Sequence, residues 1–232
     1  MRLDKFFKSA GTAVRGREPP VEADARQRLK LRSGMMPVLR ERLFATPGSC
    51  VLDLGPPSTN KFAFFTGAPC RFYTNNLPDN LFVRLATPGA VFTDDDFQEL
   101  VPQSGPSGFD VILAWDYFDY LQPPALKSLM TWLARYCRPG ALVYFLISHA
   151  KAIPEAPANI DLIDDDHLRY ESGPLVRETA KLAPRVLEGL MPGFRIQKLY
   201  LLGNGVQEHL YSYQPAPALV SVQAARTIKK IA

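Results

Sequence analysis

The 232-residue sequence has few cysteines, no long apolar run and little surplus of charge, and each absence excludes a class of protein. Cys50, Cys70 and Cys137 show no Cys-x-x-Cys spacing, so neither a disulfide framework nor a zinc cluster is indicated. No run of about 18 apolar residues is present, so no transmembrane helix is predicted. The first residues lack the apolar stretch of a secretory signal. We therefore expect a cytoplasmic protein.

Motifs of several enzyme classes are also absent. No Gly-x-Ser-x-Gly, no phosphate-binding Gly-Lys-Ser/Thr and no two-glycine dinucleotide fingerprint occurs. This argues against hydrolases, nucleoside triphosphatases and dehydrogenases. Residues 164–167, Asp-Asp-Asp-His, are the only cluster that resembles metal ligands. Carboxylates adjacent in sequence seldom converge on one ion, so we interpret this cluster as a surface loop and predict no metal site.

The basic residues are concentrated near the N-terminus. Residues 1–43 hold 11 Lys and Arg against 5 acids, whereas residues 44–232 hold 16 against 18. Residues 1–22 are therefore predicted to form a basic arm. We favour an arm that packs Phe6 and Phe7 on its own domain, the alternative being contact with a membrane surface or a partner protein. Nucleic-acid binding is not expected, because the rest of the chain has no basic and aromatic stripe.

Alternating strands and helices are the main indication of the fold. A helix is expected within residues 23–44, bent near Gly34 and Pro37, and another over 175–190, bent at Pro184. Residues 149–173 would form a long connection over the crevice. The pattern predicts strands over 49–55, 70–75, 90–93, 109–115 and 141–147, with helices over 60–65, 79–86 and 125–136.

The chain ends in a predicted antiparallel hairpin. Residues 195–202 and 206–213 read as strands, and Gly203-Asn-Gly205 reads as the turn between them. Alternating strands and helices give a doubly wound parallel sheet, into which this hairpin inserts one reversed strand. We predict a single domain over residues 23–214, followed by a tail over 215–232 with no assignable role.

In their order and spacing these segments resemble the class I S-adenosylmethionine-dependent methyltransferases. The resemblance rests on Val51-Leu-Asp-Leu-Gly55, on the strand from Phe109 to Asp116, on residues 129–145 and on the terminal hairpin. It implies an α/β fold with a Rossmann-like doubly wound sheet, mostly parallel, with one antiparallel strand from the C-terminal hairpin. It also implies S-adenosylmethionine as cofactor and methyl transfer as the reaction.

The resemblance places the cofactor at the end of the first strand. Asp53 and Gly55 occupy the positions at which the family passes a glycine-rich loop close to the cofactor. Here Pro56 and Pro57 replace the further glycines, which removes two amide donors from that loop. We predict Asp53, Gly55 and Pro56 as cofactor-binding residues of a reshaped pocket, although Asp53 could instead only bind neighbouring loop amides.

Further cofactor contacts follow from the later strands. Asn75 stands where the family commonly has a carboxylate for the ribose hydroxyls, and as a neutral acceptor it would bind more weakly. Asp94 or Asp95 would contact the adenine amino group, or else cap a helix that begins near Phe97. These three residues are predicted on the resemblance alone.

After the fourth strand, the resemblance predicts residues next to the transferred methyl group. Trp115 or Tyr117 would form a wall of the pocket, and Asp116 would orient or deprotonate the acceptor. The alternative is a turn whose aromatic side chains pack under the next helix. Methyl transfer depends mainly on alignment, so no universal catalytic residue is expected.

Two functions are consistent with these residues. The first is an S-adenosylmethionine-dependent methyltransferase acting on an unidentified small-molecule or protein acceptor. The alternative is a methyltransferase-like scaffold that has lost cofactor binding and acts as a protein- or membrane-interaction module. Pro56, Pro57 and the missing acid at Asn75 favour the alternative.

Overall fold

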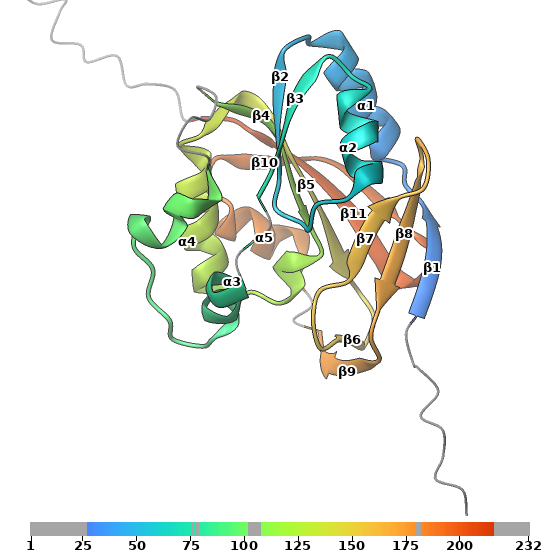
Figure 1. Ribbon diagram of the computed structural model, residues 1–232. Helices are drawn as coiled ribbons and strands as arrows, with labels where there is room; N and C mark the ends of the chain where they lie inside the picture. The colour runs from blue at the N-terminus through green and yellow to red at the C-terminus, as the bar shows by residue number, and fades with distance from the viewer. Residues whose placement is uncertain (1–26, 76, 78, 102–107, 180–181, 216–232) are drawn as a thin grey trace, which may run out of the picture.

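The computed structural model describes residues 27–75, 77, 79–101, 108–179 and 182–215, built around a six-stranded sheet (Figure 1). The strand order is β10-β11-β5-β4-β2-β3. The strands are β2 (Ser49–Asp53), β3 (Cys70–Thr74), β4 (Phe109–Trp115), β5 (Cys137–Ser148), β10 (Phe194–Leu201) and β11 (Val206–Tyr213). β2 is parallel to β3 and β4, and β4 is parallel to β5. Almost every side chain of β2 and β4 is buried, as in central parallel strands.

The last strand of the sequence is the reversed strand of this sheet. β11 lies between β5 and β10 and is antiparallel to both. A short 3₁₀ turn, η3 (Gly203–Gly205), connects β10 to β11, and Gly205 has φ +78°, a backbone conformation that favours glycine. The sheet is therefore mostly parallel with one antiparallel strand from a C-terminal hairpin. The predicted Rossmann-like α/β fold class is confirmed.

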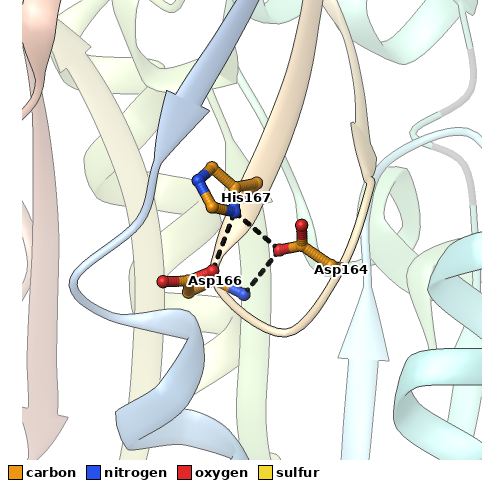
Figure 2. A group of neighbouring side chains, drawn as sticks. All are labelled: Asp164, Asp166 and His167. Carbon is orange, nitrogen blue, oxygen red and sulfur yellow. Dashed lines mark hydrogen bonds and ion pairs between the residues drawn. The ribbon is translucent and has the colours of Figure 1, made fainter.

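A second, three-stranded antiparallel sheet packs beside the first. Its order is β1 (Gln27–Arg32), β8 (His167–Ser172) and β7 (Asn159–Leu162), and the turn between β7 and β8 is drawn in Figure 2. The helix expected within residues 23–44 is therefore wrong over β1. Leu29 and Leu31 alternate with exposed basic residues, which is the period of a strand. The helix α1 (Met36–Ala45) begins only after the turn at Ser33 and Gly34.

Three further predictions of local structure are wrong. Residues 90–93 form no strand, and the chain continues there into the 3₁₀ helix η1 (Asp94–Leu100). The expected connection over 149–173 contains β7, β8 and the short β6 (Ala152–Pro154), which pairs with β9 (Leu175–Glu178). The helix expected over 175–190 is reduced to α5 (Pro184–Leu190). Proline fits its first turn because the missing N–H has no partner there.

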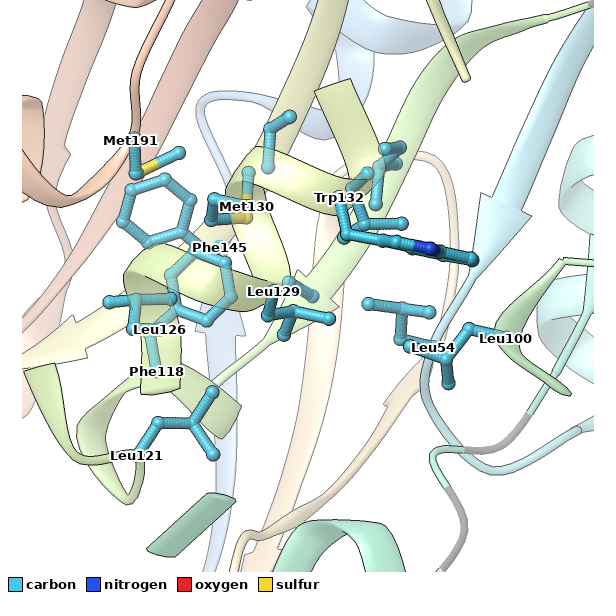
Figure 3. Packing of buried hydrophobic residues seen from close by; sticks show 14 of the residues in the cluster. Leu54, Leu100, Phe118, Leu121, Leu126, Leu129, Met130, Trp132, Phe145 and Met191 are labelled. Carbon is cyan, nitrogen blue, oxygen red and sulfur yellow. The ribbon is translucent and has the colours of Figure 1, made fainter. Parts of the chain in front are cut away.

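Apolar clusters cover both faces of the central sheet. On one face, Leu126, Leu129 and Met130 of α4 (Pro123–Ala134) lie near Phe145 of β5 (Figure 3). The helices α3 (Asp79–Ala86) and α5 lie on this side of the sheet (Figure 1). The other face packs against α1, α2 (Thr59–Thr66) and the second sheet. None of the described helices is long and apolar enough to cross a membrane.

The predicted basic arm, residues 1–22, lies outside the described residues, and so does the predicted tail from residue 216 onward. The proposed boundaries of arm, domain and tail therefore stay predictions. All three cysteines are free thiols.

Candidate functional site

A pocket of about 540 Å³ opens where β2, β3 and β4 end. Pro56 and Pro57 follow β2, Leu77 follows β3 and Tyr117 follows β4, while a segment between β6 and β7 closes the fourth side. This strand-end pocket is lined by Pro56, Pro57, Leu77, Asp79, Phe82, Tyr117, Ala156, Pro157, Ala158 and Asn159. Open α/β sheets bind their ligands beyond the carboxyl ends of the strands, so this cavity is the candidate site.

The loop after β2 is organised by a buried carboxylate. Oδ1 of Asp53 accepts hydrogen bonds from the backbone N–H of Gly55, at 2.8 Å, and from the indole Nε1 of Trp115, at 2.5 Å. A β-carbon on Gly55 would lie 2.5 Å from Cδ1 of Trp115, so position 55 requires glycine for the indole to pack there. The space beside Gly55 is thus filled by side chains of the chain itself. A ligand in the pocket meets this loop through Pro56 and Pro57.

Lys61 is a buried partner of this loop that was not predicted from the sequence. It lies in α2, whose N-cap Ser58 accepts a hydrogen bond from the Lys61 N–H. Its side chain is 1% exposed, and its Nζ lies 3.5 Å from Oδ2 of Asp53 and 4.3 Å from the centre of the Trp115 ring system. The Nζ also donates to the carbonyl of Pro56 at 3.1 Å. Both sequence neighbours of Lys61 are exposed, so the pattern predicts an ordinary surface lysine.

Burial acts on both members of this ion pair. It raises the pKa of Asp53 above its usual value, and the charge of Lys61 opposes that effect. It lowers the pKa of Lys61, and the charge of Asp53 opposes that effect. Two N–H groups donate to the carboxylate and a carbonyl accepts from the ammonium, so the local hydrogen bonds favour the charged forms of both.

Asp116, the predicted catalytic residue, lies behind the pocket wall and not among its lining residues. Its Oδ2 accepts a hydrogen bond from the backbone N–H of Ala158 at 2.9 Å, and the hydroxyl of Tyr170 lies 3.5 Å away. Burial raises the pKa of Asp116 to about 7. Because Ala158 lines the pocket, the hydrogen bond from Ala158 to Asp116 holds this part of the pocket wall in position.

The other predicted cofactor residues lie apart from the strand-end pocket, except Pro56, which lines it. The side chain of Asn75 donates to the backbone carbonyl of Glu99. Asp94 forms an exposed ion pair with Arg135, and Asp95 accepts a hydrogen bond from Gln98. Asp94 and Asp95 belong to the first turn of η1, which begins at Asp94 and not near Phe97. The carboxylate that accepts from the N-cap residue Thr93 is that of Asp96, so neither Asp94 nor Asp95 is the cap.

Asp79, and not Asp94 or Asp95, is the carboxylate that lines the strand-end pocket. It is the first residue of α3, and its side chain is exposed in the pocket lining. From the sequence it reads only as an acid at a helix start, which is common without any ligand. Its proximity to the ends of β2 and β4 depends on the path of the chain after β3, which no local pattern specifies.

The aspartates of the β7 to β8 turn form an ion-pair network. Nδ1 of His167 lies 2.8 Å from Oδ1 of Asp164 and 2.8 Å from Oδ1 of Asp166 (Figure 2). Lys30 and Arg32 of β1 approach these carboxylates at 3.8 and 2.9 Å, and Arg40 pairs with Asp165. Basic partners from β1 and α1 therefore already face each carboxylate, and the network connects the second sheet to α1.

The strand order, the reversed β11 and the pocket at the carboxyl ends of the parallel strands are those of a Rossmann-like α/β fold. Among solved structures, the 1,6-didemethyltoxoflavin-N1-methyltransferase of Burkholderia thailandensis is 15% identical over 78% of this chain and 77% of that chain, with a TM-score of 0.44. An S-adenosylmethionine-dependent methyltransferase from Clostridium acetobutylicum is 11% identical over 78% and 90% of the two chains, with a TM-score of 0.46. No protein-family model and no curated protein matches the sequence. At these identities and TM-scores, the description of the site rests on the residues of this chain alone.

Proposed function

We propose that the chain is an S-adenosylmethionine-dependent methyltransferase that holds its cofactor in the strand-end pocket. The observation that supports this proposal is the place of the pocket, between the loops after β2, β3 and β4. Its volume of about 540 Å³ falls within the roughly 300–1,000 Å³ of small-molecule sites.

The lining residues suit the nucleoside part of this cofactor. Phe82 and Tyr117, with ring centroids 5.7 Å apart, offer aromatic surface to a base. Asp79 offers a carboxylate to ribose hydroxyls, the role that the resemblance assigns to the residue at Asn75. When bound, S-adenosylmethionine supplies an activated methyl group. The chain binds and orients the two reactants.

The acceptor side of the site lies along the segment of residues 156–159. Beyond it is a second cavity of about 380 Å³, which shares Ala156, Pro157 and Asn159 with the strand-end pocket. We assign the acceptor, a small molecule or a protein, to this side. Alignment of nucleophile, methyl group and sulfur supplies most of the rate enhancement. In this proposal Asp116 contributes to alignment, because its carboxylate accepts a hydrogen bond from Ala158 and so fixes the pocket wall.

Calorimetry with S-adenosylmethionine and S-adenosylhomocysteine tests the proposal. The sharpest variant is Ala156→Trp, which places an indole in the pocket, and its matched control is Ala63→Trp on the exposed face of α2. We expect Ala156→Trp to weaken both ligands at least about tenfold, and Ala63→Trp to leave the affinity within about twofold. Absence of heat with the unsubstituted chain at millimolar ligand would remove the proposal.

One observation favours the second function, an interaction module that has lost the cofactor. Lys61 and Trp115 fill the space beside Gly55, where the resemblance places part of the cofactor. An interaction module would bind its membrane or protein partner through the basic arm. Deleting residues 1–20 should then abolish sedimentation with anionic vesicles or a protein partner without changing the circular dichroism, and unchanged sedimentation would count against it.

The compartment belongs to this proposal as well. All three thiols are free, and Cys50 is buried in the core, which suits a reducing cytoplasm.

A further inference from the structure

Lys61 has the surroundings of a bound cation. Its Nζ lies 3.5 Å from a carboxylate oxygen of Asp53, 3.1 Å from the carbonyl oxygen of Pro56 and 4.3 Å from the centre of the Trp115 ring system. A carboxylate, a carbonyl and an indole face are groups that bind organic cations when water is excluded. These three residues, Asp53, Pro56 and Trp115, are referred to as the Asp53 cage.

The cage depends on an unusual local backbone. Trp115 has φ +47°, the one positive φ of a non-glycine residue in the described chain, and this conformation occurs where its indole lies against Asp53. A β-carbon on Gly55 would lie 2.9 Å from Nζ of Lys61. Oδ2 of Asp53 has no hydrogen-bond partner among the described residues, so Lys61 is the cation that faces it.

Stability alone does not account for a lysine at this position. Burying two charges requires desolvation of both, and apolar residues of similar volume often stabilise such a site as well or better. Leucine or methionine could fill most of the same volume. The groups around Nζ, a carboxylate, a carbonyl and an indole face, are instead those of a site that binds a cation.

We infer that the Asp53 cage is a binding site for a small organic cation, an ammonium or sulfonium group, which this chain fills with its own Lys61 side chain. Pro56 belongs both to the cage and to the lining of the strand-end pocket. A pocket ligand whose cationic end reaches Pro56 therefore competes with Lys61 for the cage. The cage is defined by the chain's own residues, so this inference does not require the proposed methyltransferase activity.

Chemical rescue tests the inference. Lys61→Ala removes three methylene groups and the ammonium, and propylammonium contains these same atoms. We expect propylammonium chloride to raise the Tm of Lys61→Ala by at least about 2 °C over sodium chloride of equal ionic strength, because a ligand that binds only the folded state stabilises it. The unsubstituted chain, with its cage already filled, should show no such difference.

Three controls separate a filled cage from a general solvent effect. Lys127→Ala removes an exposed lysine of α4 and should not respond to propylammonium. Neutral 1-propanol should not rescue Lys61→Ala. Lys61→Met, which fills the cage with an uncharged side chain, should not respond to propylammonium either.

The Tm of Lys61→Ala in the two salts decides whether the Asp53 cage binds a cation. Equal Tm values for Lys61→Ala in the two salts would overturn the inference. If Lys61→Ala does not fold in sodium chloride, recovery of its native circular dichroism in propylammonium chloride supports the inference, and failure in both salts overturns it.

A second measurement tests competition with a pocket ligand. Lys61→Ala should bind S-adenosylmethionine about tenfold more tightly than the unsubstituted chain, since one charge-assisted contact becomes available. Its affinity for 5′-methylthioadenosine, which has no cationic end, should change by less than about threefold. Equal changes for both ligands would overturn the competition. Binding of neither ligand to either protein would remove the proposed function, and the amine result would still decide whether the cage binds cations.

Discussion

The glycine at position 55 has two possible physical reasons, approach of a cofactor and approach of the chain's own side chains. A glycine after a buried strand and an acid is typical of a loop that approaches a cofactor closely. In the structure, the same missing β-carbon makes room for the indole of Trp115 and the ammonium of Lys61. The need for glycine is visible in the sequence, whereas the indole that approaches it comes from Trp115, far along the chain.

Replacing Gly55 with alanine should disturb this packing. The new methyl group would lie 2.5 Å from Cδ1 of Trp115, so the indole or the loop must move. For Gly55→Ala we expect a loss of about 1–3 kcal/mol in the free energy of unfolding, measured by urea denaturation.

Gly189→Ala is the matched control for that change. Gly189 lies within α5, and a β-carbon there would meet no atom within 4 Å. This variant should gain about 0.5–1 kcal/mol, because alanine is the better helix former. A Gly55→Ala protein as stable as the unsubstituted chain would show that Trp115 does not need the space.

Lys61 marks the limit of residue-level prediction. Its neighbours Asn60 and Phe62 are exposed, and a lysine in the first turn of a short helix normally points to solvent. Only the return of β4 beside β2 brings Trp115 to this position. Asp53 could be selected from the sequence because it ends a buried strand, but its partner could not.

At the scale of elements, the segment between β6 and β7 depends on Asp116 for its position. The backbone N–H of Ala158 donates to this buried carboxylate, and burial raises the pKa of Asp116 from 3.8 to about 7. Between these values the folded protein holds a proton that the unfolded chain releases. Asp116 therefore contributes a loss of stability as the pH rises from about 4 to 7.

Asp116→Asn should remove that dependence. The amide oxygen can still accept from Ala158, and nothing at position 116 titrates. We expect the slope of unfolding free energy against pH to flatten between pH 5 and 7 by at most about 1.4 kcal/mol per pH unit, measured by urea denaturation at several pH values. An unchanged slope in Asp116→Asn would show that Asp116 is ionised in the folded protein.

A neighbouring carboxyl group should act in the same way at higher pH. Burial raises the pKa of Asp119 to about 8, so Asp119→Asn should flatten the slope of unfolding free energy against pH up to about pH 8.

The elements that the sequence predicts correctly are those with an unambiguous period. The apolar runs of β4 and β5 and the Ser58 cap of α2 indicate their structures directly. The errors lie in short strands whose partners are distant. β1 pairs with β8, and a six-residue segment of alternating leucines and basic residues fits a helix face almost as well as a strand.

For the whole molecule, the central sheet is predictable and the second sheet is not. The doubly wound order follows from alternating elements and right-handed connections, which few topologies satisfy. The second sheet joins β1 to segments about 140 positions later, and Arg32 of β1 pairs with Asp166. The position of the strand-end pocket could be predicted from the sheet, but its wall between β6 and β7 could not.

The place of β11 has a consequence for synthesis on the ribosome. β11 ends at Tyr213, yet it pairs along β5 near the middle of the sheet. Until those residues leave the exit tunnel, a nascent chain presents the bare edge of a hydrophobic strand, a template for misassociation. Premature termination before Val206, the first residue of β11, should therefore yield aggregates or substrates for proteolysis rather than a smaller stable protein.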